Sequence, residues 1–141
     1  MHGARNVGGG ERSILLLIKN LRRDIFDIIV FYTHENEIIR KIKDNGIKAI
    51  KISLHKNITS VYRDEIKINP VSFLAYVMHL VDGIFKVTKT LRKHKVDILH
   101  PHDNLSKIIG GIAAKIMGVK VVAHCRDILR ESLIEKALIF Y

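Results

Sequence analysis

Short segments with strand character alternate with segments of helical length along nearly the whole chain. β-Branched and aromatic residues dominate the strand-like segments, which we predict at 25–33, 47–54, 96–100 and 119–123. This alternation is typical of βαβ units, in which parallel strands form a sheet covered by helices. The sequence therefore predicts an α/β fold, a Rossmann-like doubly wound parallel sheet with helices on both faces.

The segments between these strands have the apolar spacing and the end residues of helices. We predict helices at 11–23, 34–45, 71–95, 104–117 and 129–141. Gly46 and Gly118 suit the helix ends before two of the strands. In the longest helix one apolar stripe is expected to face the core, made of Phe73, Leu74, Val77, Leu80, Val81, Ile84, Val87, Thr88 and Leu91.

The first helix has no apolar strand in front of it. Residues 1–7 (MHGARNV) lack the continuous apolar run of a strand buried on both faces. In a doubly wound domain the strand before the first glycine-rich turn is central, with a neighbour on each side. We therefore predict a sheet that lacks its first central strand and a domain that is marginally stable or prone to aggregate, because its neighbouring strands would expose unpaired edges.

The length of 141 residues fits a single domain covering 1–141. Lys and Arg number 24 against 14 Asp and Glu, a formal net charge of +10, which favours an anionic partner. Phosphorylated sugars, anionic lipid surfaces and nucleic acid all qualify. Aromatic residues do not alternate with the basic ones as they do in single-strand binders, so nucleic acid is disfavoured.

Targeting features indicate a cytoplasmic protein with contact at the inner face of a membrane. The amino terminus has no apolar signal core, and no apolar run approaches the roughly 20 residues of a membrane helix. The nearest candidate, 71–85, is short. Cys125 is the only cysteine, which excludes an intrachain disulfide and suits a reducing compartment.

Two short sequences could hold ligands. Gly8, Gly9 and Gly10 precede a helix, so bare backbone N–H groups could approach anionic oxygens, although a tight turn packed on the sheet is the alternative. His100 and His102 follow a strand, at the end where α/β sheets bind ligands. They could bond sugar hydroxyls or be loop histidines bonded to the backbone. Cys125 belongs to another strand and no fourth ligand is indicated, so we predict no metal.

Four motifs in order resemble those of family 4 type glycosyltransferases. Residues 8–13 (GGGERS) followed by ILLLIKNL resemble the GGxER turn and first helix of that family. NGIK at 45–48, VDILHPHDN at 96–104 and MGVKVVAHCRD at 117–127 resemble three later motifs. The resemblance covers almost the whole chain.

This resemblance implies the amino-terminal acceptor domain of a two-domain GT-B glycosyltransferase. Such an enzyme transfers a sugar from a nucleoside diphosphate sugar to a glycan or lipid-linked acceptor, without a cofactor or a protein-bound metal. The carboxy-terminal nucleotide-sugar domain is missing from 1–141, so we expect this part to be inactive alone and to need that domain, for which a separate polypeptide is one source. The alternative is a non-catalytic Rossmann-like module that docks on an anionic membrane or a phosphorylated glycan.

The resemblance also implies site residues. The residues carried over as substrate-binding are Gly8, Gly9, Gly10, Glu11, Arg12, His100, His102, Asp103 and Asn104, and those carried over as catalytic are His124, Arg126 and Asp127. Arg126 occupies the position where the family usually has a histidine. A guanidinium cannot act as a general base, but it can pair with a phosphate group. His124, two residues earlier, is therefore the candidate for the role of that histidine. As alternatives, Asp103 or Asn104 caps a helix, and Arg126 pairs locally with Asp127.

Overall fold

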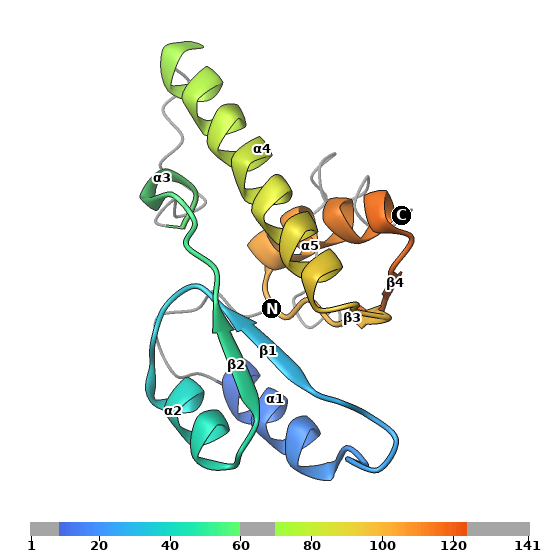
Figure 1. The fold of residues 1–141 in the computed structure, drawn as a ribbon. Coiled ribbons are helices and arrows are strands. Elements are labelled where there is room, and N and C mark those ends of the chain that lie inside the picture. Colours follow the sequence, from blue (N-terminus) through green and yellow to red (C-terminus); the bar gives the residue numbers. More distant parts are fainter. Residues whose placement is uncertain (1–8, 60–69, 124–141) are drawn as a thin grey trace.

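The structure is a computed structural model that describes residues 9–59 and 70–123. Its elements, in chain order, are α1 (Gly9–Asn20), β1 (Ile29–Tyr32), α2 (Glu37–Asp44), β2 (Lys48–Lys51), α3 (Lys56–Thr59), α4 (Pro70–Lys93), β3 (Ile98–Leu99), α5 (Asn104–Met117) and β4 (Lys120–Val121) (Figure 1). All four predicted strands are present, each shorter than predicted. The predicted helix at 129–141 lies outside the described residues.

The strands form two parallel pairs. β1 pairs with β2 in a register that places Ile29 opposite Lys48, and β3 pairs with β4 with Ile98 opposite Lys120. Within the described ranges no strand joins the two pairs. The prediction that the first central strand is missing concerns residues 1–7, which lie outside the described residues.

Helices cover both faces of the strands, as predicted. Side chains of β1 alternate between two cores, because successive residues of a strand point to opposite faces. Val30 and Tyr32 pack with residues of α1 and α2, whereas Phe31 packs with residues of α4 and α5. Leu99 of β3 belongs to the same cluster as Phe31, so the two strand pairs share one core.

Local capping explains where the helices begin and end. Asn36 caps α2 by accepting a hydrogen bond from the backbone N–H of Ile39, so the predicted helix at 34–45 begins three residues later, at Glu37. Gly46, with φ of 73°, follows that helix. Gly118 ends α5 in the left-handed conformation, as predicted.

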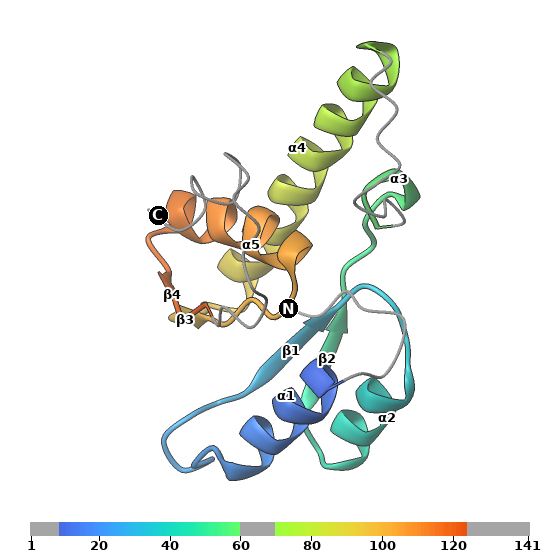
Figure 2. The same cartoon turned by 180° about the vertical axis from the view of Figure 1, so that it is seen from behind.

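The predicted apolar stripe of α4 faces the core at Leu80 and Ile84 and along the carboxyl half, but not along its first turns. Val87 and Leu91 are buried against α5, but Phe73, Leu74 and Val81 are exposed. The reason is visible in Figures 1 and 2: α5 crosses the carboxyl half of α4, and the amino end of α4 extends beyond the other described elements. Sequence periodicity gives the stripe but not the length over which it is covered.

By length and composition alone, α4 could cross a membrane, and only 11% of its most apolar window is buried. This corrects the prediction that no segment approaches the length of a membrane helix. That prediction considered only the uninterrupted apolar run at 71–85. The helix itself is longer, because it continues through Lys86 and Lys89 to Lys93.

Candidate functional site

The predicted ligand site lies at the carboxyl ends of the strands. β1 and β3 both end on the side of the molecule where α5 begins (Figures 1 and 2). We call this side the carboxyl edge. In open α/β sheets ligands bind outside this edge, where the strand order reverses.

His100 and His102 follow β3 directly at the carboxyl edge. Pro101 between them is fully buried. The Nε2 atom of His100 is buried, and the His102 side chain is half-buried. The backbone N–H of His102 donates to Ser106 Oγ at 3.0 Å, which fixes this loop against the start of α5.

Asp103 caps α5, as the alternative interpretation predicted. Its Oδ1 accepts from the Ser106 backbone N–H at 2.8 Å, while its own N–H donates to Ser106 Oγ at 3.0 Å. This reciprocal pair is a capping box. Asn104 is the first residue of α5 and is exposed. The carboxylate of Asp103 thus already occupies the helix start.

The glycine-rich segment leads directly into α1. Gly9 and Gly10 are the first two residues of that helix, Glu11 follows in the first turn, and Gly8 lies outside the described residues. Arg12 is exposed, and its charge contributes to lowering the pKa of Glu37 at the start of α2, after the larger effect of Lys41. The geometry fits a backbone that approaches anionic oxygens at a helix start.

The three residues carried over as catalytic cannot be located here. His124, Arg126 and Asp127 lie outside the described residues, just past Ala123. Their assignment remains a prediction from sequence.

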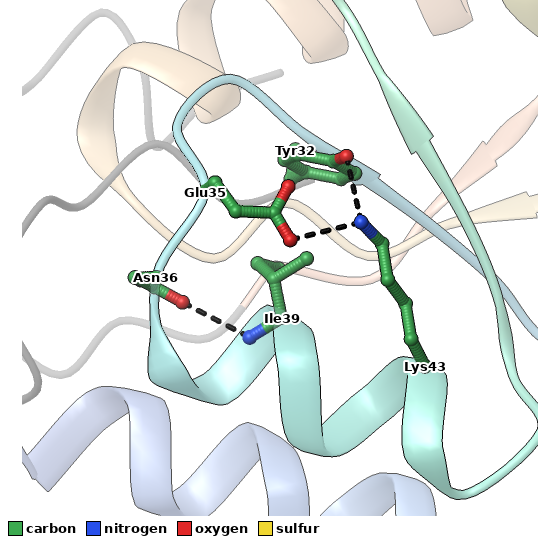
Figure 3. Close-up of polar contacts among 5 residues, drawn as sticks. All are labelled: Tyr32, Glu35, Asn36, Ile39 and Lys43. Atoms are coloured by element: carbon green, nitrogen blue, oxygen red, sulfur yellow. Dashed lines mark hydrogen bonds and ion pairs between the residues drawn. The ribbon is translucent and has the colours of Figure 1, made fainter.

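A polar group that the sequence did not reveal follows β1. Lys43 Nζ lies 2.8 Å from Glu35 Oε1 and 3.1 Å from the hydroxyl of Tyr32 (Figure 3). The hydrogen bond to Lys43 lowers the pKa of Glu35, and Glu35 in turn raises the pKa of Lys43. This pair links the loop after β1 to the last turn of α2.

Two further histidine contacts were not predicted. Thr33 is buried, and its Oγ1 lies 3.0 Å from Nδ1 of His34. His55, which follows β2, stacks on His79 of α4, with ring centroids 3.6 Å apart and planes 7° apart. Their position just after a strand, the same signal that singled out His100, could have found His34 and His55.

Two open hollows lie at the other end of the strands. One, of about 430 Å³, is lined by residues that include Val96 and Lys120, and the other, of about 410 Å³, by residues that include Ile28 and Lys48. These residues precede or begin their strands. The hollows therefore lie opposite the carboxyl edge, where strand topology places no ligand.

Among the described residues, no group of three or more His, Cys, Asp or Glu side chains could hold a metal ion. The carboxyl edge instead offers the imidazoles of His100 and His102, and α1 adds backbone N–H groups at its start and the exposed Arg12. Groups of this kind bind phosphate oxygens and hydroxyls.

Comparison with known proteins gives two findings. The model of Glycosyltransferase Family 4 matches residues 7–139. Among solved structures, the chain is similar to the crystal structure of Acinetobacter baumannii MurG, with 19% identity and a TM-score of 0.68. The similarity covers 99% of this chain but 37% of that one. A search of curated protein sequences gave no match.

Proposed function

Because the chain belongs to Glycosyltransferase Family 4, we propose that it forms the acceptor side and part of the phosphate-facing cleft of a two-domain enzyme. The donor is a nucleoside diphosphate sugar and the acceptor is a glycan or a lipid-linked glycan. A second, carboxy-terminal domain holds most of the nucleotide. The observation that carries the proposal is the family match over residues 7–139, a range that includes the glycine-rich start of α1 and the loop after β3.

The chemistry of sugar transfer determines which groups the carboxyl edge must provide. The bond between the anomeric carbon and the phosphate oxygen breaks, and the nucleoside diphosphate leaves with the electron pair. An acceptor hydroxyl bonds to the anomeric carbon and loses its proton. Backbone N–H groups at the start of α1 and the Arg126 guanidinium would stabilise the leaving phosphates. His124 would accept the proton, and His102 would bond a sugar hydroxyl.

The test is turnover by the chain mixed with a separately produced carboxy-terminal nucleotide-sugar domain. The mixture is expected to transfer sugar from at least one nucleoside diphosphate sugar, and each polypeptide alone is not. His102→Ala should lower kcat/KM at least about tenfold, as for loss of a hydrogen bond to a reacting group. His94→Ala is the matched control, because His94 follows α4 on the amino side of β3 and should leave kcat/KM within about twofold. Equal losses in both variants would refute the role of His102.

A second function, docking on an anionic membrane, is favoured by α4. Its amino half exposes large apolar side chains, and its carboxyl half carries basic ones. The exposed apolar residues of the amino half are Val71, Phe73, Leu74, Met78 and Val81, Phe85 is a further one in the carboxyl half, and the basic residues are Lys86, Lys89, Arg92 and Lys93. Contiguous exposed apolar surface marks an interaction site, and each cation near an anionic leaflet contributes about 1 kcal/mol. This function is compatible with catalysis or can stand alone.

Vesicle co-sedimentation tests the docking function. We expect binding to vesicles that contain phosphatidylserine and weaker binding to phosphatidylcholine vesicles. Leu74→Asp should weaken binding at least about tenfold, because it removes an apolar side chain worth about 1.5–3 kcal/mol when buried. Ile116→Asp is the control, since Ile116 on α5 is 63% exposed and Leu74 is 62% exposed. Equal loss in both variants would exclude a role specific to α4.

A further inference from the structure

Asn45 is the only asparagine in the chain that is followed by a glycine. Asparagine is one of the thermolabile residues of proteins. Its side-chain carbonyl carbon can be attacked by the backbone nitrogen of the next residue, and a glycine at that position has no side chain to hinder the approach. The remaining asparagines all precede larger residues; they are Asn6, Asn20, Asn36, Asn57, Asn69 and Asn104. The sequence therefore concentrates this reactivity at Asn45.

The turn between α2 and β2 exposes this pair of residues to water. Asn45 ends α2, Gly46 follows it, and both residues are exposed. No atom lies within 4 Å of the place that a Cβ on Gly46 would occupy. Water can therefore reach the Asn45 side chain, and no neighbouring group blocks a change in the backbone of this turn.

Hydrogen bonds hold the turn closed. The Gly46 backbone N–H donates to the carbonyl of Lys43 at 2.9 Å, and Asn45 Nδ2 donates to the carbonyl of Lys41 at 2.6 Å. Arg23 Nη1 donates to the carbonyl of Asn45 at 3.2 Å. Attack on the Asn45 side chain requires the Gly46 nitrogen to leave its bond to α2. The end of this helix must therefore open before the reaction, and helix ends open more easily than a core does.

We propose that Asn45 is a site of spontaneous deamidation that is controlled by opening of the end of α2 and that weakens this end once it has occurred. The Gly46 nitrogen forms a bond to Asn45 Cγ, and the bond between Cγ and Nδ2 breaks. Nδ2 leaves as ammonia, together with the proton of the Gly46 nitrogen. Water then opens the resulting succinimide ring at either of its carbonyl carbons, which gives an aspartate or an isoaspartate at position 45.

Either product is less suited than asparagine to the end of α2. A carboxylate cannot donate to the carbonyl of Lys41, and its charge lies at the negative end of the helix dipole. Isoaspartate also lengthens the backbone. Lys43, in the same turn, holds Glu35 and the hydroxyl of Tyr32. The modification is therefore expected to loosen the loop after β1 as well.

The first test measures deamidation directly. The 141-residue chain is incubated at neutral pH, and the conversion of each asparagine is followed by peptide mapping and mass spectrometry. Asn45 should convert first. Arg23→Ala should accelerate this conversion roughly two- to tenfold, as expected when one hydrogen bond no longer opposes opening. Arg22→Ala is the matched control, because Arg22 pairs with Asp24 instead. Earlier conversion of another asparagine, or equal acceleration by both variants, would overturn the proposal.

The second test measures the consequence of the modification. Asn45→Asp supplies the new carboxylate and should lower the Tm by roughly 2–8 °C, the shift expected for loss of a helix-end interaction in a domain of this size. Asn104→Asp is the control, because Asn104 is exposed at the start of α5, where a negative charge is favourable. An unchanged Tm in Asn45→Asp would overturn the proposed weakening of α2. Neither test depends on sugar transfer, so failure here would leave the glycosyltransferase proposal untouched.

Discussion

The two halves of α4 have the same apolar spacing and opposite surroundings. In the carboxyl half, Val87 and Leu91 are buried against α5, and Gly83 allows close packing with Ile109. In the amino half, Leu74 and Met78 are exposed. Periodicity alone therefore does not tell a core helix from an interaction surface. The difference lies in which neighbours the rest of the chain provides.

The halves also differ in charge. The amino half, residues 70–81, has no Lys, Arg, Asp or Glu. The first charged residue of the helix is Asp82, whose Oδ2 lies 2.6 Å from Lys86 Nζ. Basic residues then accumulate toward the end of the helix, with Arg92 and Lys93 in the last turn. Cations there interact favourably with the negative end of the helix dipole. One helix thus combines a folding role at one end with an exposed apolar surface at the other.

The largest expected effect contrasts one leucine from each half. Leu91→Ala should lower the free energy of unfolding by about 2–5 kcal/mol, because Leu91 is 1% exposed and its removal leaves a cavity. Leu74→Ala should change it by less than about 0.5 kcal/mol. Urea unfolding followed by circular dichroism measures both. Similar losses would show that the amino half is covered in solution.

A glycine contrast tests the close packing of the carboxyl half. A Cβ at Gly83 would lie 3.1 Å from Cδ1 of Ile109, so Gly83→Val should overpack this contact and cost about 1–3 kcal/mol. A Cβ at Gly111 in α5 would have no neighbouring atom within 4 Å, so Gly111→Ala should stabilise by up to about 1 kcal/mol. Thermal unfolding of both variants provides the comparison. Stabilisation by Gly83→Val would contradict this packing.

The cap of α5 tests whether the two halves of α4 depend on different partners. Asp103→Ala removes the capping carboxylate and should cost about 1 kcal/mol. Because α5 covers only the carboxyl half, amide exchange should rise in that half and stay unchanged before Asp82. Asn104→Ala is the control, since this exposed residue does not cap the helix. Faster amide exchange along the whole of α4 in Asp103→Ala would contradict the view that α5 stabilises only the carboxyl half of α4.

The smallest effect comes from the Glu35–Lys43 pair, which is remote in sequence from α4. The pKa of Glu35 is lowered from its ordinary value of 4.5, so the stability it contributes is present above that value and is lost as pH falls through the lowered pKa. The raised pKa of Lys43 makes its contribution complete below 10.5 and lost above it.

Glu35→Gln should therefore reduce the pH dependence of stability below pH 4.5. Urea unfolding between pH 3 and pH 7 measures this effect, with Asp44→Asn as the control for loss of an exposed carboxylate on α2. An unchanged pH dependence in Glu35→Gln would contradict a stabilising contact between Glu35 and Lys43.

Sequence alone could predict the α/β order, the four strands found within 9–59 and 70–123, and the helix boundaries at Gly46, Asp103 and Gly118. These features depend on local residue types, which determine strand preference, capping and left-handed backbone. The sequence also identified the absence of an apolar strand before the glycine-rich turn. That prediction used only the lack of an apolar run in residues 1–7 and the central position of the strand before the first glycine-rich turn in doubly wound domains.

Contacts between distant residues could not be predicted. The meeting of Glu35 with Lys43 depends on where α2 begins, and the stack of His55 on His79 depends on how α4 crosses the loop after β2. The exposed amino half of α4 likewise depends on the length of α5. Such features arise from tertiary packing, which residue spacing within one element does not specify.

The most direct test of the central claim is to map the binding of a nucleoside diphosphate sugar on the isotopically labelled chain by NMR. The chain is mixed with an unlabelled carboxy-terminal nucleotide-sugar domain. We predict amide shifts at Gly9 and Gly10, which begin α1, and at His100 and His102, which follow β3 at the carboxyl edge. Shifts confined to the hollows near Val96 or Ile28, or no shifts at all, would contradict the assignment of this edge as the sugar-transfer site.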